Sequence, residues 1–157
     1  MSDSGRDFDR RLTVKGQRQA ERVAELLAQR LAPSRHTAVL ASPAARTLAT
    51  AQAVAAALST RPETDDRLRV DEPVSGMLEA LALPARAAHA HSGAVVLVGH
   101  NPRVSELIDR LAATGQIDGP VSLRKSEGVL LSWAGAGAAA ASLIAACRVL
   151  GVVRGNA

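Results

Sequence analysis

The sequence predicts a three-layer α/β domain, in which a mostly parallel sheet lies between helices on both faces. Short apolar runs rich in β-branched residues alternate along the chain with amphipathic patterns of helical period. Phe8 and Trp133 are the only aromatic residues. The core is therefore expected to consist of Leu, Val, Ile and Ala, whose compact side chains suit helices packed closely on a sheet. A length of 157 residues indicates one domain, residues 1–157.

The first helix and strand are predicted from apolar spacing. Apolar residues recur every three or four positions over Arg18–Leu31, which indicates an amphipathic helix. Thr13 is its candidate N-cap. Thr37–Ala41 is predicted as a short buried strand.

A second helix follows that strand and extends to about Leu58. Ser42 is its predicted N-cap, and Pro43 occupies the first helical position, where its missing N–H costs nothing. Ser59–Asp66 is then expected to be a polar loop. Arg67–Asp71 alternates apolar and charged residues, as in an edge strand.

Ser75–Leu83 and Pro84–His91 are predicted as two short helices separated by Pro84. Ala94–Gly99 is the clearest strand, because a continuous β-branched run bounded by glycines is typical of a central parallel strand. A further helix follows, with Asn101 as its cap and Pro102 as its first residue. Its predicted buried stripe consists of Val104, Leu107, Ile108 and Leu111.

The C-terminal region has two interpretations. Gly128–Cys147 is uncharged over a length that meets the criterion for a membrane span. Ala and Gly dominate it, however, and these residues enter lipid less favourably than Leu, Ile or Phe. We therefore expect a hairpin of two strands, Gly128–Trp133 and Ala141–Cys147, and no membrane anchor.

Composition narrows the function classes. The net charge is +4, but 19 basic and 15 acidic residues are interspersed and no aromatic residues accompany them. Nucleic-acid binding is therefore not expected. The single cysteine, Cys147, excludes an intramolecular disulfide and a cysteine-based zinc cluster. The polar N-terminus shows no signal peptide, so a cytoplasmic location is predicted.

The predicted topology brings several chemically useful residues to one edge of the sheet. Ligands of open α/β sheets bind beyond the carboxyl ends of the strands. His100 follows one strand and Ser42 follows another, with Arg46 one helical turn after Ser42 and Thr50 a further turn on. Each residue alone is more often a cap or a solvated surface group. Together they describe a phosphate site.

Three motifs carry a family resemblance: Leu12-Thr13-x-x-Gly16-x-x-Gln19-Ala20, Ser42-Pro43-x-x-Arg46-x-x-x-Thr50-Ala51 and Val98-Gly99-His100-Asn101-Pro102. In this order they resemble the histidine phosphatase superfamily. The lead-in Asp7-Phe-Asp-Arg10 and the small size resemble its SixA-type phosphohistidine phosphatase branch.

The resemblance implies a phosphoglycerate-mutase-like fold and metal-independent phosphoryl transfer through a phosphohistidine on the enzyme, with no cofactor. It implies that Arg46 binds phosphoryl oxygens and that His100 stabilises charge on the transferring group. Ser42 and the N-terminus of the helix at Asn101 are the further phosphate-binding candidates. The implied partner is a phosphorylated protein or a small phosphomonoester.

The chain departs from the family at one point. Members open with a strand that ends in Arg-His-Gly or Arg-His-Ala, and that histidine is the nucleophile; the first strand is missing from the predicted fold. His36, His89 and His91 precede their strands and are expected at the opposite end of the sheet. Two explanations are open: a reading frame begun at an internal methionine, or a chain that lost its chemistry. The corresponding functions are a phosphatase, or an inactive module that binds phosphate or a phosphopeptide.

Overall fold

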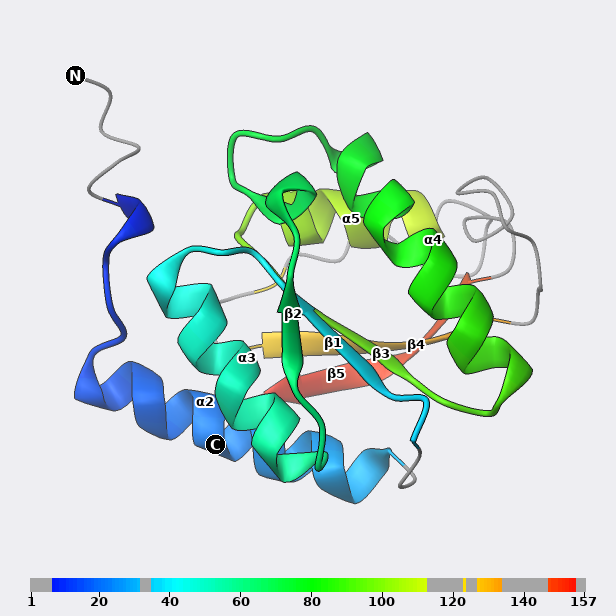
Figure 1. Ribbon diagram of the computed structural model, residues 1–157, viewed down its shortest axis with the longest axis horizontal. Helices are drawn as coiled ribbons and strands as arrows, with labels where there is room; N and C mark the ends of the chain where they lie inside the picture. The colour runs from blue at the N-terminus through cyan, green and yellow to red at the C-terminus, as the bar shows by residue number, and fades with distance from the viewer. Residues whose placement is uncertain (1–6, 32–34, 113–122, 124–126, 134–146, 155–157) are drawn as a thin grey trace.

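The computed structural model describes residues 7–31, 35–112, 123, 127–133 and 147–154. Within these residues, helices and strands alternate over most of the chain (Figure 1). They are α2 (Val14–Arg30), β1 (Ala38–Ala41), α3 (Ala45–Ala57), β2 (Pro62–Thr64), η1 (Asp66–Leu68), α4 (Val74–Ala90), β3 (Val95–Val98), α5 (Arg103–Ala112), β4 (Glu127–Trp133) and β5 (Cys147–Arg154).

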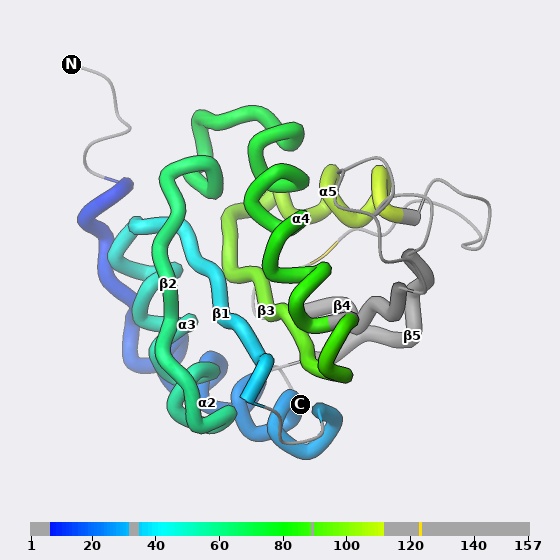
Figure 2. Tube along the Cα trace, turned by 45° about the vertical axis from the view of Figure 1, so that its right-hand side comes forward, coloured from blue at the N-terminus to red at the C-terminus, as the bar shows by residue number. Residues whose placement is uncertain are grey.

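The main sheet is parallel, with the strand order β2-β1-β3 (Figure 2). β1 and β3 are aligned residue for residue, from Ala38 opposite Val95 to Ala41 opposite Val98. β4 and β5 form a separate antiparallel pair with an irregularity between Leu130 and Leu131. The α/β class is therefore confirmed, with a three-stranded parallel sheet.

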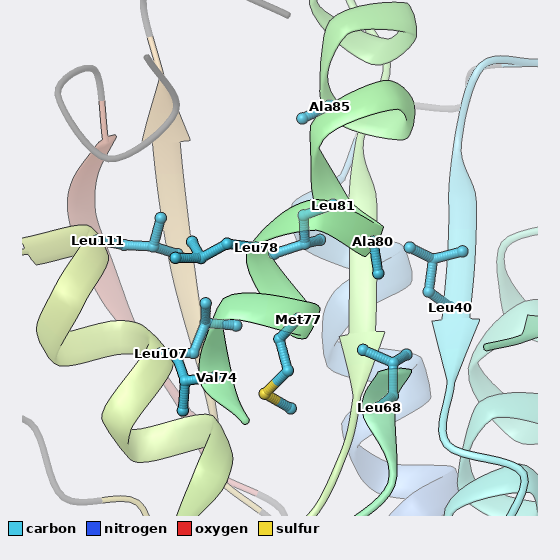
Figure 3. Close-up of a cluster of buried hydrophobic side chains, with 10 residues drawn as sticks. All are labelled: Leu40, Leu68, Val74, Met77, Leu78, Ala80, Leu81, Ala85, Leu107 and Leu111. Atoms are coloured by element: carbon cyan, nitrogen blue, oxygen red, sulfur yellow. The ribbon is translucent and has the colours of Figure 1, made fainter. Parts of the chain in front are cut away.

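Alternating side chains of β1 and β3 divide the core between the two faces of this sheet. Leu40 packs with residues of α4 and α5 in the cluster drawn in Figure 3. Val95 and Leu97 of β3 are packed against the same cluster. Val39 and Val96 pack on the other face with α2 and α3. Helices thus cover both faces, as predicted.

The predicted first helix and its cap are confirmed. Helix α2 contains the predicted stripe, with Ala20, Ala24 and Leu27 buried. The Thr13 hydroxyl accepts a hydrogen bond from the Gly16 amide at 3.1 Å. The helix begins earlier than predicted because this cap is followed directly by helical backbone.

The predicted cap of the second helix is wrong. Helix α3 begins at Ala45, and its N-cap position is Ala44, which makes no side-chain capping bond. The Ser42 hydroxyl contacts His100 instead. The hydroxyl also accepts a long hydrogen bond of 3.5 Å from the Ala44 amide, which lies before the helix and does not make Ser42 its N-cap.

The region after α3 also differs from the prediction. The expected polar loop Ser59–Asp66 contains β2, an edge strand held by backbone pairing, whose residues Glu63 and Thr64 are exposed. The expected edge strand Arg67–Asp71 is absent: residues 66–68 form η1, and Leu68 is fully buried beneath α4. A strand forms where a neighbouring backbone can pair with it, and the pattern of side chains along the sequence does not show where that neighbour lies.

Pro84 does not separate two helices but lies inside α4. Buried residues on both sides of Pro84 form one continuous apolar face: Met77, Leu78, Leu81, Ala85 and Ala88. Packing of this face against the sheet compensates for the backbone hydrogen bond that proline cannot donate.

The central position predicted for Ala94–Gly99 is wrong for the described sheet. β3 lies at its end and β1 in its middle. All four residues of β3 are only half-buried, whereas Val39, Leu40 and Ala41 of β1 are buried. No strand precedes β1 among residues 7–31.

The C-terminal hairpin is confirmed as an antiparallel pair of strands, and the described second strand extends beyond the predicted end at Cys147. β4 matches the predicted Gly128–Trp133, but its partner β5 begins at Cys147. The predicted strand Ala141–Cys147 lies outside the described residues except for its last one. Among the helices of the described segments, none has the length and apolar content needed to cross a membrane.

Candidate functional site

The candidate site lies at the carboxyl ends of β1 and β3. Ser42 directly follows β1, and its amide donates to the Val98 carbonyl at 3.1 Å, which joins the two strand ends. His100 lies two residues beyond β3, and Arg46 lies in the first turn of α3. The topology therefore brings these three side chains together, as the sequence predicts.

His100 is held between Ser42 and Arg46. Its Nε2 lies 3.0 Å from the Ser42 Oγ, and its Nδ1 lies 3.2 Å from the Arg46 Nη2. A guanidinium can only donate, so Nδ1 must accept and the ring proton must lie on Nε2. His100 is thus assigned as the neutral tautomer that donates to Ser42.

The surroundings of His100 favour this neutral form. Burial lowers the pKa of His100, and the positive charge of Arg46 lowers it further. The carboxylates of Asp7 and Asp71 oppose this effect. Only 5% of His100 is exposed, and Ser42 is fully buried.

Arg46 makes a two-pronged ion pair with Asp7. Its Nη1 and Nη2 lie 2.8 and 2.7 Å from the two carboxylate oxygens. The side chains of Arg46 and Asp7 are 31% and 40% exposed, so the pair is open to solvent. This is the geometry in which a guanidinium holds a carboxylate or two phosphoryl oxygens.

The residue after Asp7 is held by a second arginine. The Arg69 guanidinium lies 4.9 Å from the centre of the Phe8 ring, within the range of a cation–π contact. Arg69 itself lies close to Asp66 and Asp71, at 3.9 and 3.5 Å. Residues 7–8 therefore connect the start of α3 with the turn after η1.

The remaining predicted residues face elsewhere. The Asn101 amide nitrogen donates to the Leu123 carbonyl at 2.8 Å, and its oxygen accepts from the Ser105 hydroxyl at 3.3 Å. The Thr50 hydroxyl donates to the Arg46 carbonyl one turn earlier. Phosphate binding by Asn101 or Ser42 stays a prediction.

Two histidines lie together at the opposite end of the sheet. His36 precedes β1 and His91 precedes β3, and their rings stack with centroids 3.9 Å apart. Their position confirms that neither can act beside His100. No group of three His, Cys, Asp or Glu residues that could hold a metal ion occurs within the described segments.

Asp7 is the site residue that the sequence reasoning did not single out. It appeared only in the lead-in motif Asp7-Phe-Asp-Arg10, with no role. Its contact with Arg46 spans 39 positions of the chain. The sequence signal that could have identified Asp7 is its position as an acidic residue shortly before the motif that begins at Leu12.

Comparisons with known proteins agree with the motifs. A model of the histidine phosphatase superfamily (branch 1) matches residues 3–72. The SixA protein of Agrobacterium tumefaciens, assigned as a phosphohistidine phosphatase, is 30% identical, with 71% of this chain and 68% of that one covered and a TM-score of 0.55. The protein histidine phosphatase SixA, solved in complex with tungstate, is 20% identical over 99% of this chain and 90% of that one, with a TM-score of 0.69. No curated protein is significantly similar in sequence.

Proposed function

Since the chain belongs to the histidine phosphatase superfamily, we propose that it is a phosphatase of the phosphohistidine type that acts through a phosphohistidine intermediate. In this reaction the phosphoryl group moves from the substrate to the family's nucleophilic histidine, and water then releases it as phosphate. The sequence of this chain contains no Arg-His-Gly or Arg-His-Ala motif that would supply this histidine. The substrate is a phosphorylated protein or a small phosphomonoester.

The cluster of Arg46 and His100 is the observation that carries this proposal. The Arg46 guanidinium has the position and the two-pronged geometry to bind phosphoryl oxygens. The neutral His100 next to it accepts a hydrogen bond from Arg46 Nη2 and donates its own N–H to Ser42, so it holds the guanidinium in place. Preorganised donors of this kind stabilise the charge that develops during phosphoryl transfer without a metal ion.

A specific observation keeps a second function in view. The family's nucleophile is a histidine close to the phosphoryl group, and His36 and His91 lie at the opposite end of the sheet. A chain that binds through Arg46 without turnover is a module for phosphate or a phosphopeptide.

The short connection between β2 and α4 supports a protein substrate over a small one. Only η1 and its flanking turns, residues 65–73, separate these elements, which leaves little material to enclose a small ligand. A phosphohistidine nitrogen leaves readily once protonated, so such a substrate needs no additional acid. A full-length protein that carries the nucleophilic histidine is expected to release phosphate faster from a phosphohistidine-containing protein than from sugar phosphates.

Titration with tungstate, a tetrahedral oxyanion, tests the site by calorimetry. Arg46→Lys keeps the charge but loses the fork, so its Kd is expected to rise about tenfold, equivalent to about 1.4 kcal/mol. Arg22→Lys is the matched control, because Arg22 is exposed on α2 and pairs only with Glu25 among the contacts described. Equal affinities of the two variants would contradict the assignment of Arg46.

Phosphate release from a phosphohistidine-containing protein then separates the two functions. The phosphatase is supported if the wild type shows turnover and both Arg46→Lys and His100→Asn reduce it. Arg46-dependent binding of tungstate with no turnover supports the binding module.

A further inference from the structure

Asp7 occupies the edge of the Arg46 guanidinium, formed by Nη1 and Nη2, to which an oxyanion would bind. Its carboxylate takes both Nη1 and Nη2, and Nη2 is also the atom that contacts His100 Nδ1. An oxyanion that binds to both Nη1 and Nη2 of Arg46 requires this same edge. We propose that Asp7 is a built-in competitor, so that a phosphoryl group binds by displacing the Asp7–Phe8 segment. This inference rests on the proposed role of Arg46 as an oxyanion ligand.

Charge excludes simultaneous occupancy. A phosphoryl group and the Asp7 carboxylate are both anionic, and each satisfies the same two N–H groups of Arg46. Only one anion can hold those two N–H groups at a time, and a second anion beside it is repelled. The Asp7 side chain must therefore leave before a ligand can take its place.

The contacts of the segment are of a kind that a ligand can displace. Asp7 and Arg46 are both partly exposed, and ion pairs open to water are weak. The neighbouring contact is the Phe8 ring against the Arg69 guanidinium. The short turn at residues 7–9 has an Arg10 amide to Asp7 carbonyl distance of 3.4 Å, a long hydrogen bond. No residue of this turn belongs to either buried cluster.

The competition selects among anions. A monocarboxylate gains no more at Arg46 than Asp7 already supplies, and it lacks the advantage of being tethered to the chain. A doubly charged tetrahedral oxyanion offers Arg46 more negative charge than a carboxylate does. Asp7 thus favours phosphoryl-like dianions over carboxylates.

The test compares tungstate binding by the full chain and two variants. Asp7→Asn removes the competing charge and keeps the shape, so its Kd for tungstate is expected to fall by about threefold or more, the effect of losing an exposed pair. Asp9→Asn is the matched control, because it makes the same charge change two residues away in an exposed position. Its Kd is expected to stay within about twofold of the wild type.

Cleavage by trypsin at Arg10 and Arg11 supplies a second readout. Tungstate is expected to accelerate this cleavage in the wild type by releasing the segment, and Asp7→Asn is expected to be cleaved faster even without tungstate. The proposal that Asp7 competes would be wrong if Arg46→Lys weakened tungstate binding while Asp7→Asn left it unchanged or also weakened it. That result would still support the anion site at Arg46. No binding by any variant would remove both the anion site and its competitor.

Discussion

Replacing Ser42 by Ala tests the arrangement on which the site depends. The Ser42 hydroxyl accepts the Nε2–H of His100 at 3.0 Å, with Ser42 fully buried and His100 5% exposed. The variant leaves that N–H without its acceptor in a place that water scarcely reaches. A buried polar group left without its partner costs about 1–3 kcal/mol. For a domain of this size the melting temperature should fall by about 2–4 °C for each kcal/mol.

A double-mutant cycle isolates this contact. Urea denaturation followed by circular dichroism gives the free energies of unfolding of Ser42→Ala, His100→Asn and the double variant. Asn retains a polar group near the position of Nδ1 and has no atom that corresponds to Nε2. The cost of Ser42→Ala should therefore disappear in the His100→Asn background, with a coupling of at least about 1 kcal/mol.

Two results would refute the reasoning. One is a cost of Ser42→Ala as small as that of Ser75→Ala, an exposed serine near the start of α4 for which we expect a change within about 0.5 kcal/mol. The other is an equal cost in both backgrounds, which would mean that Ser42 does not act through His100.

The remaining predictions concern pH and backbone packing. Because burial and Arg46 lower the pKa of His100, the unfolded chain binds more protons at this residue between the lowered value and the ordinary value of about 6.5. The resulting stability is fully present above about pH 6.5 and is lost as the pH falls through the lowered pKa. The urea midpoint of His100→Asn should therefore fall less than that of the wild type between about pH 8 and pH 5. Equal changes of the two midpoints with pH would contradict this. Gly93→Ala should destabilise the protein by about 1–3 kcal/mol, since a Cβ there would collide with the His36 carbonyl. In Gly16→Ala the new Cβ meets the flexible end of Leu12 at 3.3 Å, so this control should be neutral or stabilising by up to about 1 kcal/mol; equal melting temperatures of the two variants would count against the close approach at Gly93.

The sequence by itself determined the α/β class and the place of the site. Apolar runs with the periods of strand and helix identified β1, β3, α2 and α5, because burial on a sheet or a helix face is repeated locally along the chain. The positions of His100 and Arg46 then followed from the rule that parallel strands end at one edge of a sheet.

Only the tertiary structure decided which residue contacts which. Ser42 was predicted as a cap from its neighbours, but the shorter contact of its hydroxyl is with the buried ring of His100, 58 positions away. Pro84 breaks helices in isolation, yet α4 continues through it because one apolar face extends over both halves. Backbone pairing with β1 turned the polar segment at residues 62–64 into a strand.

The ion pair of Asp7 with Arg46 is the clearest example of what sequence alone could not supply. Asp7 lies in a polar segment with no periodic pattern, and nothing local distinguishes it from Asp9. Its role depends on where the chain places it relative to α3, 39 positions later. Local patterns reflect the burial of each element, whereas the contacts of a site are made between elements. Those contacts depend on the distances that the packed sheet and helices set between them.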